Sequence, residues 1–247
     1  MDSIDVTADY GDQCGESPLW DERSQSLFWT DIAGRRFYRY IWAEQQPEIV
    51  RAGFEIAGFA FLEPHGFVVV NSTGVWLWDG ADHFHCLVRE VGGRRCILND
   101  CIADPEGRLF TGSTFFDPNR EDYELGFLLR VDADGSAHVV EEGIRLSNGL
   151  AFSSDESTFY YVDSAARSIY AYDYSRKHGA LRNRRVLVHV RVDQGVPDGI
   201  TVDASGCIWC AHWFGGAIVG YRQRAQLTEI FVFLRLKRLA SGSVGRT

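Results

Sequence analysis

No apolar run in this sequence is long enough to cross a membrane, since the longest, such as Ile230–Leu234, span about five residues. The N-terminus also lacks the basic region and apolar core of a secretory signal, so we expect a cytoplasmic protein without a membrane partner. Positive charge is in deficit, and the net charge of −9 disfavours nucleic acid as a partner. Methionine is almost absent, with 1 residue, whereas glycine (25 residues) and aromatic residues (13%) are plentiful. This balance favours a turn-rich β protein over a bundle of helices.

The 6 cysteines, in a chain without a secretory signal, are expected to be reduced thiols. Cys207 and Cys210 have the spacing of a zinc-binding pair, but no second pair accompanies them. They also fall in a predicted strand, where residues three apart point to opposite faces. A cysteine zinc site is therefore not expected.

Five segments of the chain resemble one another over their first six residues. Each continues through a polar turn, such as Pro105–Arg108, and resumes as an apolar or aromatic strand, such as Phe159–Tyr161. The segments are Glu16–Asp21, Gly58–Glu63, Asn99–Asp104, Asn148–Ser153 and Asp198–Asp203. The repeated pattern of strand, tight turn and strand predicts five β-hairpins in succession.

The hairpins recur at intervals of about 40 to 50 residues, which is the spacing of four-stranded propeller blades. We therefore predict an all-β fold, with residues 1–247 forming a single β-propeller domain whose blades begin near residues 16, 58, 99, 148 and 198. Residues 222–247 do not continue the repeat, and six of them are Lys or Arg against one acid, Glu229. We expect this segment to be an atypical remnant of the last blade. The prediction is a propeller of the six-bladed type, with five complete blades and an incomplete sixth.

The first residue of each repeat should reach the central channel of a propeller at the same height in every blade. In four of the five repeats this residue carries a side-chain oxygen: Glu16, Asn99, Asn148 and Asp198, with Gly58 as the exception. Converging carboxylate and amide oxygens suit a hard divalent cation such as Ca²⁺ or Mg²⁺, whereas zinc and copper favour the Cys and His that this position lacks. Taken singly, Asn or Asp before Gly is also a common turn residue, so loop chemistry is the alternative for each. Their recurrence at one repeat position predicts a metal site.

Four motifs resemble the regucalcin/gluconolactonase family, also called the senescence-marker-protein family of sugar lactonases. They are Gly15–Trp20, Asn99–Asp100 followed by Asp104–Phe110, Ser147–Phe152 and Pro197–Asp203. The resemblance spans roughly residues 10 to 221, with the motifs in the family's order and spacing. It implies a six-bladed propeller that uses one divalent cation in its channel to hydrolyse a sugar lactone to the aldonic acid. Ca²⁺ is the expected ion, with Zn²⁺, Mg²⁺ or Mn²⁺ as alternatives.

Carried over residue by residue, the resemblance implies that Glu16, Asn148 and Asp198 bind the metal ion. Asn99 matches a channel residue of the family that contacts substrate, and Asp198 also matches the proposed general base. The chemistry is coherent, because a cation would polarise the lactone carbonyl while a carboxylate takes a proton from the attacking water.

The sequence departs from the family at two substrate contacts and at its C-terminal end. Where the family has an Arg two residues before the channel Asn, this chain has Ile97; strand alternation would place Arg95 on the same face as a partial substitute. The third repeat has an insertion, Phe115–Glu124, between its second and third strands, in which Asp122 is the best match to a substrate-contacting acid, with Glu121 or Glu124 as alternatives. The tail resembles a truncation or a change of reading frame, and we expect the apolar run Ile230–Leu234 to form one strand beside the fifth blade or the N-terminal segment.

Two other functions fit the same residues. A phosphotriester hydrolase on the same scaffold would need the same oxygen-bound cation, and a propeller that has lost its last blade could bind Ca²⁺ or a sugar without catalysis. The sequence leaves the oligomeric state, the particular sugar and the activity of the shortened chain open.

Overall fold

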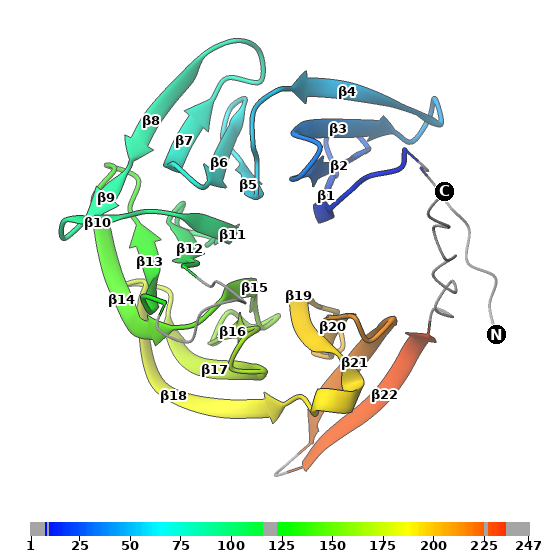
Figure 1. The fold of residues 1–247 in the computed structure, drawn as a ribbon, viewed down its shortest axis with the longest axis vertical. Helices are drawn as coiled ribbons and strands as arrows, with labels where there is room; N and C mark the ends of the chain where they lie inside the picture. Colours follow the sequence, from blue (N-terminus) through cyan, green and yellow to red (C-terminus); the bar gives the residue numbers. More distant parts are fainter. Residues whose placement is uncertain (1–7, 9, 116–122, 225–226, 236–247) are drawn as a thin grey trace, which may run out of the picture. The chain divides into compact units, whose positions relative to one another are not determined.

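The computed structural model describes residues 8, 10–115, 123–224 and 227–235 of the chain. These residues form five four-stranded sheets, a two-stranded ribbon and one turn of 3-10 helix, Val192–Gln194 (Figure 1). Within each four-stranded sheet the strands are hydrogen-bonded in chain order, which is the up-and-down topology of a propeller blade. The described residues contain no helix that is long and apolar enough to span a membrane.

The strands follow one another with short turns. The first sheet contains β1 (Gly15–Asp21), β2 (Ser26–Asp31), β3 (Arg36–Ile41) and β4 (Gln46–Ala52). The second contains β5 (Gly58–Phe61), β6 (Phe67–Asn71), β7 (Gly74–Trp78) and β8 (Phe84–Val88). The ribbon of β9 (Glu90–Val91) and β10 (Arg94–Arg95) precedes the third sheet, which contains β11 (Leu98–Ala103), β12 (Leu109–Ser113), β13 (Gly126–Val131) and β14 (Ala137–Ile144). The fourth contains β15 (Ser147–Phe152), β16 (Thr158–Asp163), β17 (Ser168–Ser175) and β18 (Ala180–His189), and the fifth contains β19 (Val196–Val202), β20 (Ile208–Trp213), β21 (Ala217–Arg224) and β22 (Leu227–Arg235).

The acidic residue that ends a repeat segment builds the hairpin turn after it. The carboxylate of Asp203 accepts hydrogen bonds from the backbone N–H of Ser205 (2.8 Å) and Cys207 (3.0 Å) and from the indole N–H of Trp209 (2.9 Å). A hydrogen bond from the Ser205 hydroxyl contributes most, and with these bonds it holds the pKa of Asp203 well below its usual range. Asp104 makes the same kind of turn in the third sheet, accepting from the backbone N–H of residues 106 and 108. The turn chemistry therefore recurs with the repeat.

The chain divides into two compact units. The described residues of the first unit fall within Met1–Phe115 and Leu125–Gly143 and form the first three sheets; those of the second fall within Phe116–Glu124 and Ile144–Thr247 and form the fourth and fifth. In the first unit, one apolar cluster joins the first and second sheets around Phe37 and Trp78, and another joins the second and third around Val70 and Phe127. In the second unit, Val162 of the fourth sheet packs in one cluster with Cys210 of the fifth. The arrangement of residues 1–247 as a single domain stays a prediction.

The predicted all-β class and the five complete blades are confirmed, and so is the expected strand beside the fifth blade, but the assignment of the tail to a remnant of the last blade is wrong. The apolar run does form a strand, and Leu227–Arg235 pairs antiparallel with Ala217–Arg224 as the fourth strand of the fifth sheet. The sequence assigned all of 222–247 to a remnant of a last blade because the repeat motifs mark only the first strands of each sheet. A fourth strand carries no motif, so the fifth blade was counted as complete before β22. Residues 236–247 lie outside the described part of the chain.

A buried histidine in the fifth sheet gives the fold a pH dependence. The ring of His212 is 4% exposed, with Nδ1 2.8 Å from the Gln194 carbonyl oxygen and Nε2 2.8 Å from the Tyr221 hydroxyl. Because a carbonyl oxygen only accepts, Nδ1 carries the proton and Nε2 accepts from Tyr221. Burial lowers the pKa of His212, so the folded protein holds this ring neutral.

We expect this histidine to destabilise the fold in mild acid. The unfolded chain takes up the proton at about pH 6.5, before the folded chain does, so the free energy of unfolding falls as the pH drops below that value. Thermal unfolding of the wild type and of His212→Gln at pH 7.5 and 5.5 measures the effect. The melting temperature of the wild type should drop more between the two pH values than that of the variant. Parallel drops would contradict the assignment, and His85→Gln, at an exposed position, is the control.

Candidate functional site

Four of the five sheets contain a β-bulge at or beside the first residue of the repeat. The extra residue lies between Leu98 and Cys101 in β11, between Ser147 and Leu150 in β15, and between Pro197 and Ile200 in β19. The bulges therefore fall on the pairs Asn99–Asp100, Asn148–Gly149 and Asp198–Gly199. In contrast, β5, whose repeat begins with Gly58, pairs regularly with β6 along its length. Because a bulge redirects the side chains that it contains, the sheets with a candidate ligand share a backbone feature that the sheet without one lacks.

In the first sheet the bulge comes one residue later. Glu16 lies opposite Thr30 in the last regular pair, and the irregularity follows between Glu16 and Leu19. Ser17, inside the bulge, has a positive φ of 51°. The Glu16 side chain is half-buried, and its Oε1 lies 3.9 Å from the Cys14 thiol. Glu16 thus stands beside the bulge of its sheet rather than within it.

Local bonds account for part of the choice of Asn and Asp at the bulges. The Gly149 N–H donates to Asn148 Oδ1 at 3.0 Å, and the Cys101 N–H donates to Asp100 Oδ1 at 2.7 Å. In the fifth sheet the Gly199 N–H interacts with the Asp198 carboxylate. A bulge removes one backbone N–H from the sheet ladder, and a short polar side chain supplies the missing acceptor. The alternative of loop chemistry is therefore real for each of these residues.

Asp198 has a further feature that loop chemistry does not explain. Burial raises the pKa of this carboxyl group, although hydrogen bonds from the Asn148 side chain and the Gly199 N–H oppose the shift. Its Oδ1 atom is buried and has no hydrogen-bond partner in the part of the chain that the structure describes. A buried carboxylate oxygen without a partner costs free energy unless a proton or a cation satisfies it. The second unit thus brings Asn148 and Asp198 together and leaves one oxygen available to a ligand.

The residues of this pair fit a hard divalent cation. Asp198 supplies the unsatisfied carboxylate oxygen, and the amide oxygen of Asn148 has a second acceptor site beyond the one that Gly149 occupies. Burial raises the pKa of the neighbouring Cys210 thiol to about 12, so at neutral pH this sulfur is no thiolate ligand. Among the described residues no three His, Cys, Asp or Glu side chains are grouped to hold a metal ion. The predicted set, with two carboxylates and one amide, does not depend on such a group.

Of the three predicted substrate contacts, the structure describes Asn99 and Arg95. Asn99 is half-buried in the bulge of β11, in the first unit with Glu16. Arg95 is exposed and lies in β10, where it pairs with Glu90 of β9. The argument that strand alternation puts Arg95 on the face of Ile97 and Asn99 is therefore wrong, because β11 begins only at Leu98. Asp122 and its alternative Glu121 lie outside the described residues.

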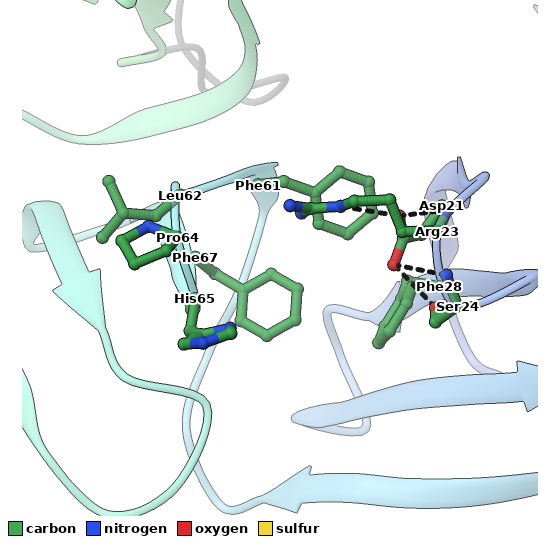
Figure 2. Close-up of a pocket in the computed structure, with 10 residues that line it drawn as sticks. Asp21, Arg23, Ser24, Phe28, Phe61, Leu62, Pro64, His65 and Phe67 are labelled. Carbon is green, nitrogen blue, oxygen red and sulfur yellow. Dashed lines mark hydrogen bonds and ion pairs between the residues drawn. The ribbon is translucent and has the colours of Figure 1, made fainter.

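A pocket of about 360 Å³ in the first unit lies away from these residues. It is formed by the turn after β1 and the turn between β5 and β6, with the rings of Phe28, Phe61 and Phe67 on its wall (Figure 2). Its Arg23 pairs with Glu63 at 2.8 Å and with Asp21 at 3.7 Å. Since Asp21 is the last residue of β1 and Glu16 is near its start, the pocket is at the opposite end of the strand from the candidate ligand. Because Arg23 is already paired with two carboxylates, we assign no chemistry to this pocket.

Comparisons with known proteins agree with the repeat and its motifs. A family model described as the SMP-30/Gluconolactonase/LRE-like region matches residues 14–234. The chain belongs to this family, which confirms the resemblance drawn from the motifs.

Individual relatives cover most of the chain. The pentonolactonase XacC of Haloferax volcanii is 33% identical over 209 residues, covering 84% of this chain and 69% of the relative. The 6-deoxy-6-sulfogluconolactonase of Pseudomonas putida is 33% identical over 218 residues, covering 87% of this chain and 74% of the relative. A solved structure of a luciferin-regenerating enzyme superimposes with a TM-score of 0.77 at 28% identity, covering 89% of this chain and 76% of that chain.

Proposed function

We propose that this protein hydrolyses a sugar lactone with the help of one divalent cation, held by Glu16, Asn148 and Asp198. The observation that carries the proposal is the buried Asp198 Oδ1, next to Asn148, for which the described residues offer no hydrogen-bond partner. Membership of the family supports it, as do the two relatives that are named for lactone hydrolysis.

The three proposed ligands offer oxygen atoms, two of them from carboxylates, and this favours Ca²⁺ over softer ions. Zn²⁺, Mg²⁺ and Mn²⁺ remain alternatives for experiment. A cation at this position would supply a Lewis acid for the carbonyl oxygen of the lactone. Asn99, with a half-buried amide, would hydrogen-bond the hydroxyl groups of the substrate.

Asp198 is the proposed general base. Burial raises the pKa of this carboxyl group, which favours a proton acceptor, whereas a cation bound to the same carboxylate would lower the pKa. In the reaction, the oxygen of a water molecule bonds to the lactone carbonyl carbon while Asp198 takes a proton from that water. The ester C–O bond of the ring then breaks, and the leaving ring oxygen takes the proton back from Asp198 to become a hydroxyl, which restores the carboxylate. The product is the open-chain hydroxy acid.

Two further substrate contacts are proposed with less support from the fold. Asp122, which lies between β12 and β13 in the sequence, would meet the substrate hydroxyls, and Arg95 would have to reach the site from the exposed ribbon β9–β10. Ile97, which stands where the family has an Arg, offers no hydrogen bond to a substrate. For that reason we propose a sugar lactone as the class, with lactones of five-carbon and six-carbon sugars both to be tested.

A panel of sugar lactones and one phosphotriester, each assayed with and without a chelator, tests the proposal. We expect hydrolysis of at least one lactone, its loss with chelator and its return on addition of Ca²⁺. Hydrolysis of the phosphotriester alone would favour the other hydrolase class. Binding of Ca²⁺ without turnover of any substrate would favour a non-catalytic binding protein. Lactone hydrolysis that survives full removal of metal would contradict the mechanism.

A further inference from the structure

Gly149 lies against the backbone of the next sheet at the candidate site. A Cβ atom at this position would stand 2.6 Å from the Asp198 carbonyl oxygen and 2.6 Å from the Ile200 N atom. Real Cβ atoms do not approach backbone this closely, so any larger residue would push β15 away from β19. The backbone of Gly149 does not have a positive φ, so space and not conformation requires glycine here.

The first unit repeats this arrangement. A Cβ atom on Gly58 of β5 would lie 3.0 Å from the Cys101 N atom and 3.1 Å from the Asp100 Cα atom, both in or next to the bulge of β11. In each unit, then, a glycine in the first strand of one sheet touches the bulge in the first strand of the following sheet. Figure 1 shows β5 beside β11 and β15 beside β19. Gly58, the first repeat residue that carries no side-chain oxygen, therefore packs against the bulge that contains Asn99.

We propose that Gly149 is a positioning residue, which sets the separation of β15 and β19 so that Asn148 and Asp198 can share one cation. Gly58 does the same for the bulge that carries Asn99, the proposed substrate contact. The inference rests on the proposed function, because it concerns the same metal ligands. It explains why a glycine directly follows Asn148: the ligand needs the next sheet at van der Waals contact, and only a residue without a side chain allows it.

Gly199 provides a matched control. It follows Asp198 as Gly149 follows Asn148, but a Cβ atom there would meet nothing within 4 Å, and its φ is not positive. Gly149→Ala should weaken Ca²⁺ binding by about 10- to 100-fold, the effect typical of residues that orient metal ligands. Gly199→Ala should bind Ca²⁺ as the wild type does. Isothermal titration with Ca²⁺ alone, at a temperature well below the melting point of each variant, measures both.

Gly58→Ala separates positioning from a general loss of packing. This variant should raise KM for the lactone through Asn99 and leave the affinity for Ca²⁺ unchanged, so the two glycines should affect different measurements. If Gly149→Ala does not fold, a raised KM together with an unchanged Ca²⁺ affinity in Gly58→Ala still tests the arrangement. Wild-type Ca²⁺ affinity in folded Gly149→Ala, or equal effects of the two variants on Ca²⁺ affinity, would overturn the inference while leaving the proposed function standing. A wild-type protein that binds no divalent cation would contradict both.

Discussion

Replacing Asp198 with Asn should abolish turnover while metal binding is only weakened. The amide still offers an oxygen to a cation, but it cannot accept the proton of the attacking water. Removing a general base costs about 100- to 10,000-fold in rate. The measurement is kcat at saturating Ca²⁺, with the affinity for Ca²⁺ determined separately so that loss of the ion is not mistaken for loss of the base.

Asp203→Asn is the matched control for this variant. It makes the same chemical change in the same sheet, but at a carboxylate that holds a turn through two backbone N–H groups and an indole. We expect Asp203→Asn to lower the melting temperature and to leave kcat within about twofold of the wild type, since a turn residue acts on stability and not on the reacting atoms. A near-normal kcat in Asp198→Asn at saturating Ca²⁺ would remove Asp198 from the role of base.

Glu16→Gln should act mainly on metal affinity. The substitution keeps an oxygen at the same place but removes one negative charge from a set that holds two, so we expect Ca²⁺ affinity to fall by about 10- to 100-fold. At saturating Ca²⁺, kcat should recover to near the wild-type value, because Glu16 takes no proton in the proposed reaction. Calcium titration and kinetics at two Ca²⁺ concentrations measure both parts.

The control for this variant is Glu44→Gln, at an exposed turn position of the same sheet. It removes the same charge from the first unit, so any effect of net charge on cation binding appears in both variants. Equal Ca²⁺ affinities of Glu16→Gln and Glu44→Gln would show that Glu16 is not a ligand.

The repeat in the sequence was sufficient to predict the architecture. A polar residue, an apolar strand, a turn and a second strand recur because each blade must present one face to each neighbour and needs the same turn chemistry, as Asp104 and Asp203 illustrate. Starts near residues 16, 58, 99, 148 and 198 correspond to β1, β5, β11, β15 and β19.

Strand partners and register were harder to predict. The fourth strands carry few constraints, since they form the last strand of each sheet, and the apolar run of β22 predicted a strand without deciding between the fifth blade and the N-terminal segment as its neighbour. The bulges could not be predicted from the sequence either, because an inserted residue has no fixed sequence signature apart from Gly or Asn nearby. Arg95 was placed wrongly for a related reason. Alternation holds only within one strand, and the turn at Gly92 and Gly93 pairs Arg95 with Glu90 in a separate ribbon before β11.

At the candidate site, the residue types could be predicted from the repeat, whereas their surroundings depend on the packing of the sheets. Asp198 could be named as an acid at a repeat position, but its burial and the lack of a partner for Oδ1 depend on how β15 packs against β19. The role of Gly149 could not be separated from ordinary turn chemistry, because Asn–Gly is a frequent turn pair. Only the distance from its Cβ position to the next sheet distinguishes the two explanations.

A crystal structure of the protein grown with Ca²⁺ is the most direct test of the central claim, which is that one cation is shared by ligands from three sheets. We expect a single ion bound by side-chain oxygens of Glu16, Asn148 and Asp198, each about 2.3 to 2.6 Å from the ion, with Asn99 facing the same space. An ion bound elsewhere, or an Asp198 carboxylate directed away from Glu16 with no ion between them, would contradict the account.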